Sequence, residues 1–138
     1  MCPAHMGAPD KRDLLEIMTR ILFIDDDALT LELMGRVTDL LGHEAILCST
    51  AAQALELVLH DKPGIIMVDY HLSDSDGLEF IQKLRSKASM AETPVFMLTA
   101  GVSLQMKEEA RLAGAQGILE KPLSLDLLAQ VIKKYESN

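Results

Sequence analysis

Short apolar runs alternate with amphipathic stretches along most of this chain. The first run, Arg20–Ile24, is too short for a helix and stops abruptly at three aspartates, a pattern typical of a β-strand. Residues 28–41 then place apolar side chains on one helical face, and Gly42 is suited to end that helix in a left-handed conformation. The pattern therefore predicts a strand, an acidic loop and a helix.

The same unit recurs four more times. Further strands are predicted at residues 44–48, 64–68, 95–98 and 117–119. A helix is predicted to follow each of these strands. The first begins with a capping box at residues 50–53 and runs to about residue 60, and the second carries Leu78, Ile81 and Leu84. The last two cover residues 104–113 and, after a cap at Ser124, residues 125–135. Because strands alternate with helices and the middle three strands are apolar throughout, we expect a five-stranded parallel sheet covered on both faces. The fold class is doubly wound α/β.

Length, charge and composition disfavour several classes of function for this chain. A length of 138 residues suits one domain with its own core. The 13 basic and 21 acidic residues give a net charge of −8, which disfavours direct nucleic-acid binding and anionic lipid. The longest apolar run, residues 65–68, is far below the roughly 20 residues that span a bilayer, so no membrane insertion is expected. Two cysteines suit a reducing, cytoplasmic location.

The chain is expected to divide into an N-terminal segment, residues 1–18, and the α/β domain, residues 19–136. The first segment is a tail or a short helix, with Leu14, Leu15 and Met18 at helical spacing over residues 10–18. Within it, His5-Met6 resembles the remnant of a purification vector, so residues 1–9 carry no weight in the fold prediction.

Polar residues follow four of the predicted strands. In open parallel sheets the functional site lies beyond the carboxyl ends of the strands, so these side chains are expected to meet. They are Asp25, Asp26 and Asp27 after the first strand, Asp69 after the third, Thr99 after the fourth and Lys121 after the fifth. Clustered carboxylates repel one another and are tolerated only with a cation or with shifted pKa values, and hard oxygen ligands suit Mg²⁺. Beside a lysine and a hydroxyl, one carboxylate can accept a phosphoryl group as an acyl phosphate.

The sequence resembles the receiver domain of two-component response regulators, the chemotaxis-regulator-like superfamily, over about residues 20–135. Five motifs in order carry the resemblance: Phe23-Ile24-Asp25-Asp26, Val68-Asp69, Asp76-Gly77, Leu98-Thr99-Ala100 and Lys121-Pro122. The resemblance implies a flavodoxin-like strand order, 2-1-3-4-5. It also implies a phosphorylation switch in which a histidine kinase or a histidine phosphotransfer protein phosphorylates Asp69. Such a protein is a regulator and not an enzyme, with at most self-catalysed phosphotransfer and dephosphorylation.

The resemblance also implies residue roles. Asp26 would bind Mg²⁺ or Mn²⁺ directly and Asp25 largely through water, with Asp69 and the backbone carbonyl of His71 completing the metal site. Thr99 and Lys121 would hold the phosphoryl oxygens, and the bond before Pro122 would be cis. The switch would pass from Thr99 to Ile118. Output would reach a separate partner or an effector domain outside this sequence.

Two departures from the family pattern affect these expectations. Leu72-Ser73 stands where the family often has Met-Pro, which predicts a more mobile loop after Asp69. Ile118 replaces the usual aromatic residue, so we expect the loop from Ala100 to Ser103 to carry more of the switch, with Gly101 permitting movement.

Three other interpretations remain open. Residues 24–29 resemble the first motif of haloacid-dehalogenase-type phosphatases, in which Asp25 would be the nucleophile and Asp27 the acid/base. That assignment leaves Asp69 without a role and finds no acidic pair after Lys121. A receiver-like module without phosphate turnover is disfavoured by the full acceptor set. Alternatively, the aspartates are a solvated helix cap, and Thr99 and Lys121 are ordinary surface residues.

Overall fold

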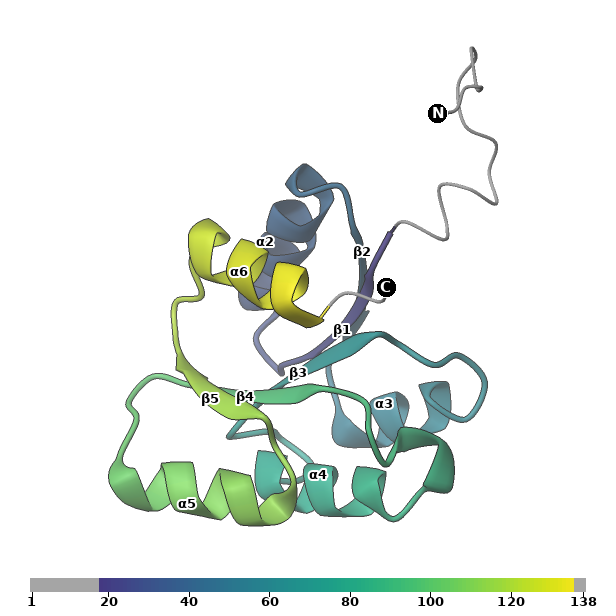
Figure 1. Cartoon of the computed structure of the whole chain (residues 1–138), viewed down its shortest axis with the longest axis vertical. Coiled ribbons are helices and arrows are strands. Elements are labelled where there is room, and N and C mark those ends of the chain that lie inside the picture. Colours follow the sequence, from purple (N-terminus) through teal and green to yellow (C-terminus); the bar gives the residue numbers. More distant parts are fainter. Residues whose placement is uncertain (1–17, 136–138) are drawn as a thin grey trace.

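The computed structural model describes residues 18–135, in which strands and helices alternate around a single sheet (Figure 1). All strand pairs are parallel, in the order β2-β1-β3-β4-β5. The strands are β1 (Arg20–Ile24), β2 (Glu44–Cys48), β3 (Ile65–Asp69), β4 (Val95–Thr99) and β5 (Gly117–Glu120). The doubly wound fold and its strand order are therefore confirmed.

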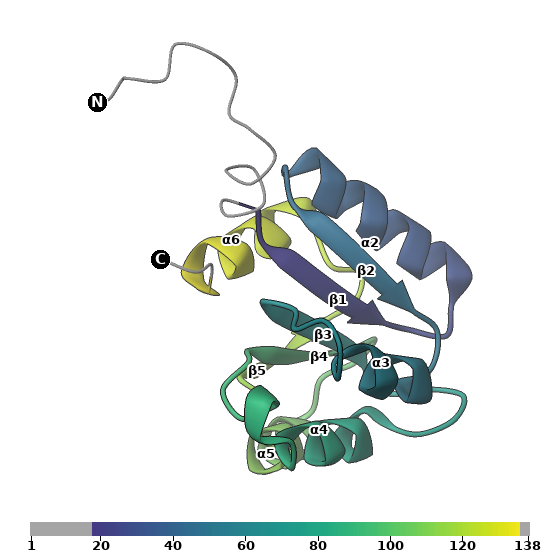
Figure 2. The ribbon, with the colours of Figure 1, turned by 90° about the vertical axis from the view of Figure 1, so that its right-hand side faces the viewer.

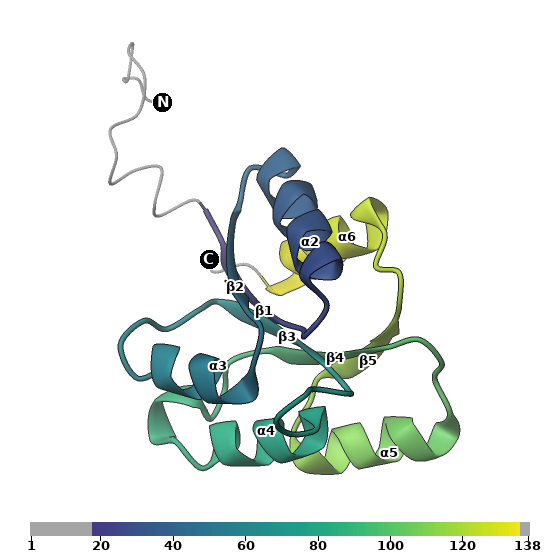
Figure 3. The same cartoon turned by 180° about the vertical axis from the view of Figure 1, so that it is seen from behind.

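Helices cover both faces of the sheet. They are α2 (Ala28–Leu40), α3 (Ala51–Leu57), α4 (Gly77–Arg85), α5 (Leu104–Ala113) and α6 (Leu125–Tyr135), with a short 3₁₀ helix, η1 (Ala88–Met90), before β4. Helices α2 and α6 lie on one face and α3, α4 and α5 on the other (Figures 2 and 3). Within residues 18–135, no helix is both long and apolar enough to cross a membrane.

The alternation of side chains along each strand explains why the sheet has a hydrophobic core on each of its two faces. Successive side chains of a strand point to opposite faces. In β1, Ile21 and Phe23 are buried against α2 and α6, whereas Leu22 and Ile24 are buried against the other three helices. Because the central strands have helices on both sides, every residue of β3 and β4 is buried. This arrangement requires the continuous apolar runs that the sequence shows.

Most helix ends follow the predicted signals. The Thr50 hydroxyl accepts the Gln53 N–H at 3.1 Å, and the Ser124 hydroxyl accepts the Leu127 N–H at 3.1 Å. Gly42 has a φ of 82°, which is the left-handed conformation expected after α2. These side-chain and backbone contacts fix where α2, α3 and α6 begin or end.

Several predicted boundaries were wrong by one or more residues. Helix α3 ends at Leu57 and not near His60, because Leu59 and His60 donate to carbonyls three residues back, which tightens the chain into a turn. Strands β3 and β4 include Asp69 and Thr99 as their last residues, and η1 was not predicted. The predicted helix over residues 10–18 lies outside the described residues, except for Met18.

Candidate functional site

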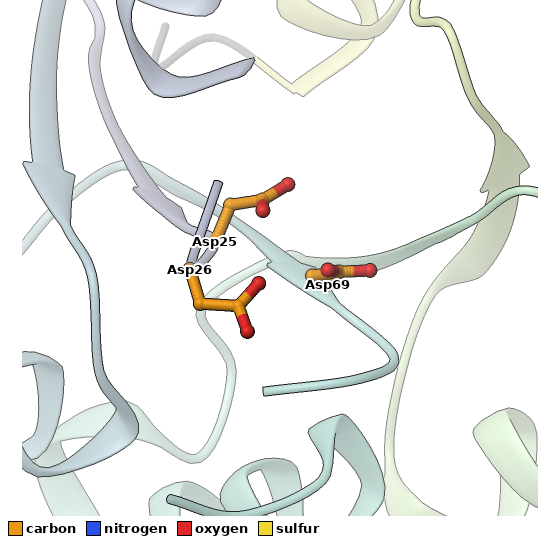
Figure 4. Close-up of side chains that lie close together, drawn as sticks. All are labelled: Asp25, Asp26 and Asp69. Atoms are coloured by element: carbon orange, nitrogen blue, oxygen red, sulfur yellow. The ribbon is translucent and has the colours of Figure 1, made fainter. Parts of the chain in front are cut away.

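Three carboxylates meet at the carboxyl ends of β1 and β3 (Figure 4). These strands are neighbours, with Ile24 paired to Val68, so the residues that follow them come together. One carboxylate oxygen from each of Asp25, Asp26 and Asp69 lies within 4.8 Å of the others. Asp25 and Asp69 are only 3% and 8% exposed, whereas Asp26 is exposed. The cluster is therefore an acidic pocket that opens to solvent at Asp26.

Lys121 brings one positive charge into this pocket from the end of β5. Its Nζ donates to Asp25 Oδ2 at 2.7 Å and lies 3.3 Å from Asp69 Oδ2. Its backbone N–H donates to the Thr99 carbonyl at 2.7 Å, which ties the loop to β4, and the Lys121–Pro122 peptide bond is cis. One ammonium faces three carboxylates, so the pocket keeps an excess of negative charge.

The two oxygens of Asp25 are both occupied by internal donors. Oδ2 accepts from Lys121, and Oδ1 accepts the backbone N–H of Asp27 at 2.9 Å. Asp27 itself caps α2, where its carboxylate accepts from Leu29 N–H and from the Thr30 hydroxyl. Asp25 is thus a fixed, buried carboxylate, and Asp27 is a helix cap.

Burial and neighbouring charges shift the pKa values of Asp69 and Lys121. Burial and the negative charge of Asp25 raise the pKa of Asp69, and Lys121 offsets only part of that increase. Burial by itself would lower the pKa of Lys121, but its contacts with Asp25 and Asp69 outweigh burial and raise it. The ammonium therefore stays charged, while the Asp69 carboxylate lacks sufficient neutralising charge.

This donor set fits a divalent cation that prefers oxygen. Mg²⁺ takes carboxylate and carbonyl oxygens together with water, and Mn²⁺ accepts similar ligands. A cation between Asp25, Asp26 and Asp69 would supply the positive charge that Lys121 alone does not supply. The exposure of Asp26 leaves room for water and for an incoming phosphoryl group.

The predicted hydroxyl lies beside the cluster without contacting it. Thr99 is the last residue of β4, which neighbours β3, and its side chain is buried. The hydroxyl donates to the Gly101 carbonyl at 3.3 Å and not to a carboxylate. Ile118 is half-buried in β5 against the core formed with α3, α4 and α5. The structure therefore joins Asp25, Asp26, Asp69 and Lys121 directly, with Thr99 adjacent.

The loop after Asp69, residues 70–76, is closed by its own hydrogen bonds. The Gly77 N–H donates to the Tyr70 carbonyl at 2.8 Å, and His71 forms an isolated antiparallel bridge with Asp76. A Cβ on Gly77 would lie 2.7 Å from the Asp69 carbonyl oxygen, so the close return of the chain requires glycine. The Asp76-Gly77 motif thus brings the start of α4 against the end of β3.

The sheet order and the acidic pocket agree with a known family. The model of the response regulator receiver domain matches residues 21–133, which include all the pocket residues. The chain belongs to this family. Among its relatives, response regulator MprA of Mycobacterium leprae is 34% identical over 113 residues, covering 81% of this chain and 49% of MprA. Polar-differentiation response regulator DivK of Brucella anthropi is 26% identical over 115 residues, covering 83% of this chain and 94% of DivK.

Solved structures show the same receiver fold. The chemotaxis response regulator CheY4 of Vibrio cholerae superposes with a TM-score of 0.80 at 24% identity, over 86% of this chain and 98% of CheY4. The protein is a receiver domain of the two-component type, a regulator and not a classical enzyme, whose general partner is a phosphodonor kinase. These comparisons give no support to the phosphatase alternative. The chain spans about half the length of MprA.

Proposed function

We propose that this chain is a phosphorylation switch in which Asp69 accepts a phosphoryl group from a phosphohistidine of a histidine kinase or a histidine phosphotransfer protein. The geometry of Asp69 is the observation that supports this most directly. Its carboxylate is buried, lies 3.3 Å from the Lys121 ammonium and shares an oxygen cluster with Asp25 and Asp26. Asp25, by contrast, has both oxygens engaged, which disfavours it as the nucleophile.

The transfer needs one bond formed and one broken. An Asp69 carboxylate oxygen attacks the phosphorus, the phosphorus–nitrogen bond of the phosphohistidine breaks, and its electron pair returns to the imidazole, which leaves neutral or protonated. Lys121 holds one phosphoryl oxygen, and the Thr99 hydroxyl turns from Gly101 to donate to another. Asp26, Asp69 and the His71 carbonyl would bind Mg²⁺ or Mn²⁺ directly and Asp25 through water. When bound, the cation would supply positive charge to the phosphoryl oxygens.

In this proposal residues 19–136 form the receiver domain that carries the function, and the function does not depend on residues 1–18. The domain would catalyse its own phosphorylation and, by admitting water opposite the acyl oxygen, its own dephosphorylation. Its output acts on a separate protein or on an effector domain in the same polypeptide. A net charge of −8 disfavours direct contact with nucleic acid.

A small-molecule phosphodonor tests the proposal without the cognate kinase. The protein, incubated with acetyl phosphate and Mg²⁺, is expected to gain the mass of one phosphoryl group in intact mass spectrometry. Chelation with EDTA is expected to prevent the gain, because the Lys121 ammonium is then the one positive charge among the described residues that faces three carboxylates and the phosphoryl group. An unchanged mass with both acetyl phosphate and a phosphorylated histidine phosphotransfer protein would contradict the proposal.

Thr99 is expected to transmit the change to α5. The phosphoryl group on Asp69 would carry about two negative charges, which would draw the hydroxyl away from the Gly101 carbonyl and move the loop before α5. A Cβ added at Gly101 would contact nothing within 4 Å, so this loop has room to move. Beryllofluoride, a phosphoryl mimic, should therefore shift backbone NMR signals of α5, β5 and α6 as well as those of the pocket.

Two variants separate the routes of this switch. Thr99→Ala is expected to blunt the NMR response of α5 more than Ile118→Val, because the alanine removes the only hydroxyl at the start of the proposed path, whereas valine keeps a branched side chain. Shifts confined to the pocket in the wild-type protein, with α5 unchanged, would refute this route. A larger loss in Ile118→Val would assign the coupling to β5 instead.

A further inference from the structure

The loop between β3 and α4 carries a carboxylate that faces a different helix from the one it precedes. Asp74 Oδ1 accepts the Ala51 N–H at 3.0 Å, and Oδ2 accepts the Ala52 N–H at 3.1 Å. These N–H groups open α3, which lies 22 to 23 residues earlier in the chain. They lower the pKa of Asp74, so its carboxylate is ionised at neutral pH and accepts both bonds with charge assistance.

The start of α3 is in turn linked to the acidic pocket through β2. The Asp25 N–H donates to the carbonyl of Cys48, the last residue of β2, at 3.1 Å. Only two residues separate Cys48 from Ala51. The β2–α3 corner is therefore bonded on one side to the strand end that carries Asp25 and on the other side to the loop that follows Asp69.

The hydrogen bonds inside the loop do not provide this link. Leu72 N–H donates to the Ser75 carbonyl at 3.1 Å, and Gly77 N–H donates to the Tyr70 carbonyl at 2.8 Å, both within the loop and its ends. These bonds shape the turn but do not reach β1 or α3. The Tyr70 N–H donates to the Leu98 carbonyl at 2.8 Å, which ties the first residue of the loop to β4. Residues 70–76 also contain no proline, so no ring restricts the backbone φ angles. Among the described residues, the hydrogen bonds that tie the middle of the loop to an earlier helix are those of Asp74.

We propose that Asp74 is a positioning residue for phosphoryl transfer, because its two bonds to the start of α3 hold the His71 carbonyl at the metal pocket. The proposal rests on the proposed function of Asp69. Asp74 contacts neither phosphate nor metal in this role. Without its carboxylate, the loop samples other positions, and the carbonyl is a poorer ligand although Asp25, Asp26 and Asp69 are unchanged.

The test compares two substitutions that each remove a cap from α3. Asp74→Ala removes the two bonds from the loop, whereas Thr50→Ala removes the bond that the Thr50 hydroxyl accepts from Gln53 N–H and leaves the loop in place. Both are expected to lower the melting temperature in EDTA by a similar few degrees. Only Asp74→Ala is expected to raise the Mg²⁺ dissociation constant, by about tenfold, as for other residues that orient metal ligands.

Phosphorylation by acetyl phosphate gives a second readout of the same effect. Asp74→Ala should react slowly at low Mg²⁺ and regain most of the wild-type rate when Mg²⁺ is saturating, because the substitution weakens the metal site without removing a reacting group. Asp74→Asn keeps one acceptor oxygen and is expected to lie between alanine and wild type. Thr50→Ala should follow the wild-type Mg²⁺ dependence throughout.

The possible results separate the two proposals. Equal Mg²⁺ affinity in Asp74→Ala and Thr50→Ala would overturn the positioning role and reduce Asp74 to a helix cap. A wild-type protein that binds Mg²⁺ but never takes up a phosphoryl group would overturn the proposed function. In that case the Mg²⁺ affinities of the same variants still decide whether Asp74 orients the metal site.

Discussion

Replacing Asp69 by asparagine is expected to abolish phosphoryl incorporation and, at the same time, to stabilise the metal-free protein. The amide is not a nucleophile toward phosphorus, so transfer is lost completely. The same substitution removes a buried negative charge that is repelled by the charge of Asp25. It also removes the 3.3 Å contact between Asp69 and Lys121, but Lys121 keeps its hydrogen bond to Asp25. We expect a gain of about 1 kcal/mol in the free energy of unfolding, measured by urea denaturation in EDTA.

The stability that Asp69→Asn gains over wild type should become smaller as the pH is lowered. The pKa of Asp69 is raised in the folded state above its ordinary value of 3.8, so the folded protein binds the proton more tightly than the unfolded chain does. The stability from this protonation is fully present below the unfolded pKa and is lost as the pH rises through the folded pKa. The advantage of Asp69→Asn is therefore largest near neutral pH and shrinks on acidification towards pH 3.8.

Asp39→Asn is a suitable control, because it removes a negative charge from an exposed position of α2, outside the acidic pocket. It should take up the phosphoryl group normally and change the unfolding free energy by less than about 0.5 kcal/mol. A lower stability of Asp69→Asn than of wild type, in EDTA at neutral pH, would show that the pocket holds no destabilising excess of negative charge.

Asp26→Ala is expected to remove the stabilisation that Mg²⁺ gives to the folded protein. A ligand that binds only the folded state stabilises it by about 2.7 kcal/mol at a concentration one hundred times its dissociation constant. Asp26 is the exposed member of the cluster and forms no hydrogen bond that holds the fold among the described residues, so alanine should leave the metal-free protein intact. The Mg²⁺-dependent rise in melting temperature, and phosphorylation by acetyl phosphate, should both disappear.

The measurement is thermal unfolding with and without Mg²⁺, with each variant compared with itself. Asp39→Ala removes the same charge from an exposed position and should keep the full Mg²⁺ response, which excludes a general effect of net charge. A full Mg²⁺ response in Asp26→Ala would place the cation elsewhere and remove Asp26 from the metal site.

The fold and the residues that share the pocket could be predicted from the sequence, because both depend on patterns within short stretches of the chain. Apolar runs of three to five residues, each followed by an amphipathic stretch, specify strands and helices through their own periodicity. Parallel strands then bring their carboxyl ends to one edge, so the residues at these ends, Asp25, Asp69 and Lys121, could be assigned to one site without knowledge of any distance.

Contacts between distant segments could not be predicted in this way. Asp74 lies in a polar loop, and nothing in its neighbours indicates that it binds a helix 23 residues earlier. The half-buried Arg85 is similar, since its Nη1 donates to the Met90 carbonyl at 2.7 Å and its Nη2 donates to the Gly114 carbonyl at 2.8 Å. The direction of the Thr99 hydroxyl was also undetermined, because χ1 can occupy different staggered rotamers and the observed one depends on the loop around Gly101.

The most direct test of the central claim identifies which aspartate carries the phosphoryl group. Protein phosphorylated with acetyl phosphate and Mg²⁺ is treated with borohydride, which reduces an aspartyl phosphate to homoserine, and the modified residue is located by peptide mass spectrometry. We expect homoserine at position 69 and at no other aspartate. Homoserine at position 25 would contradict this expectation and would restore the interpretation in which Asp25 is a phosphatase nucleophile.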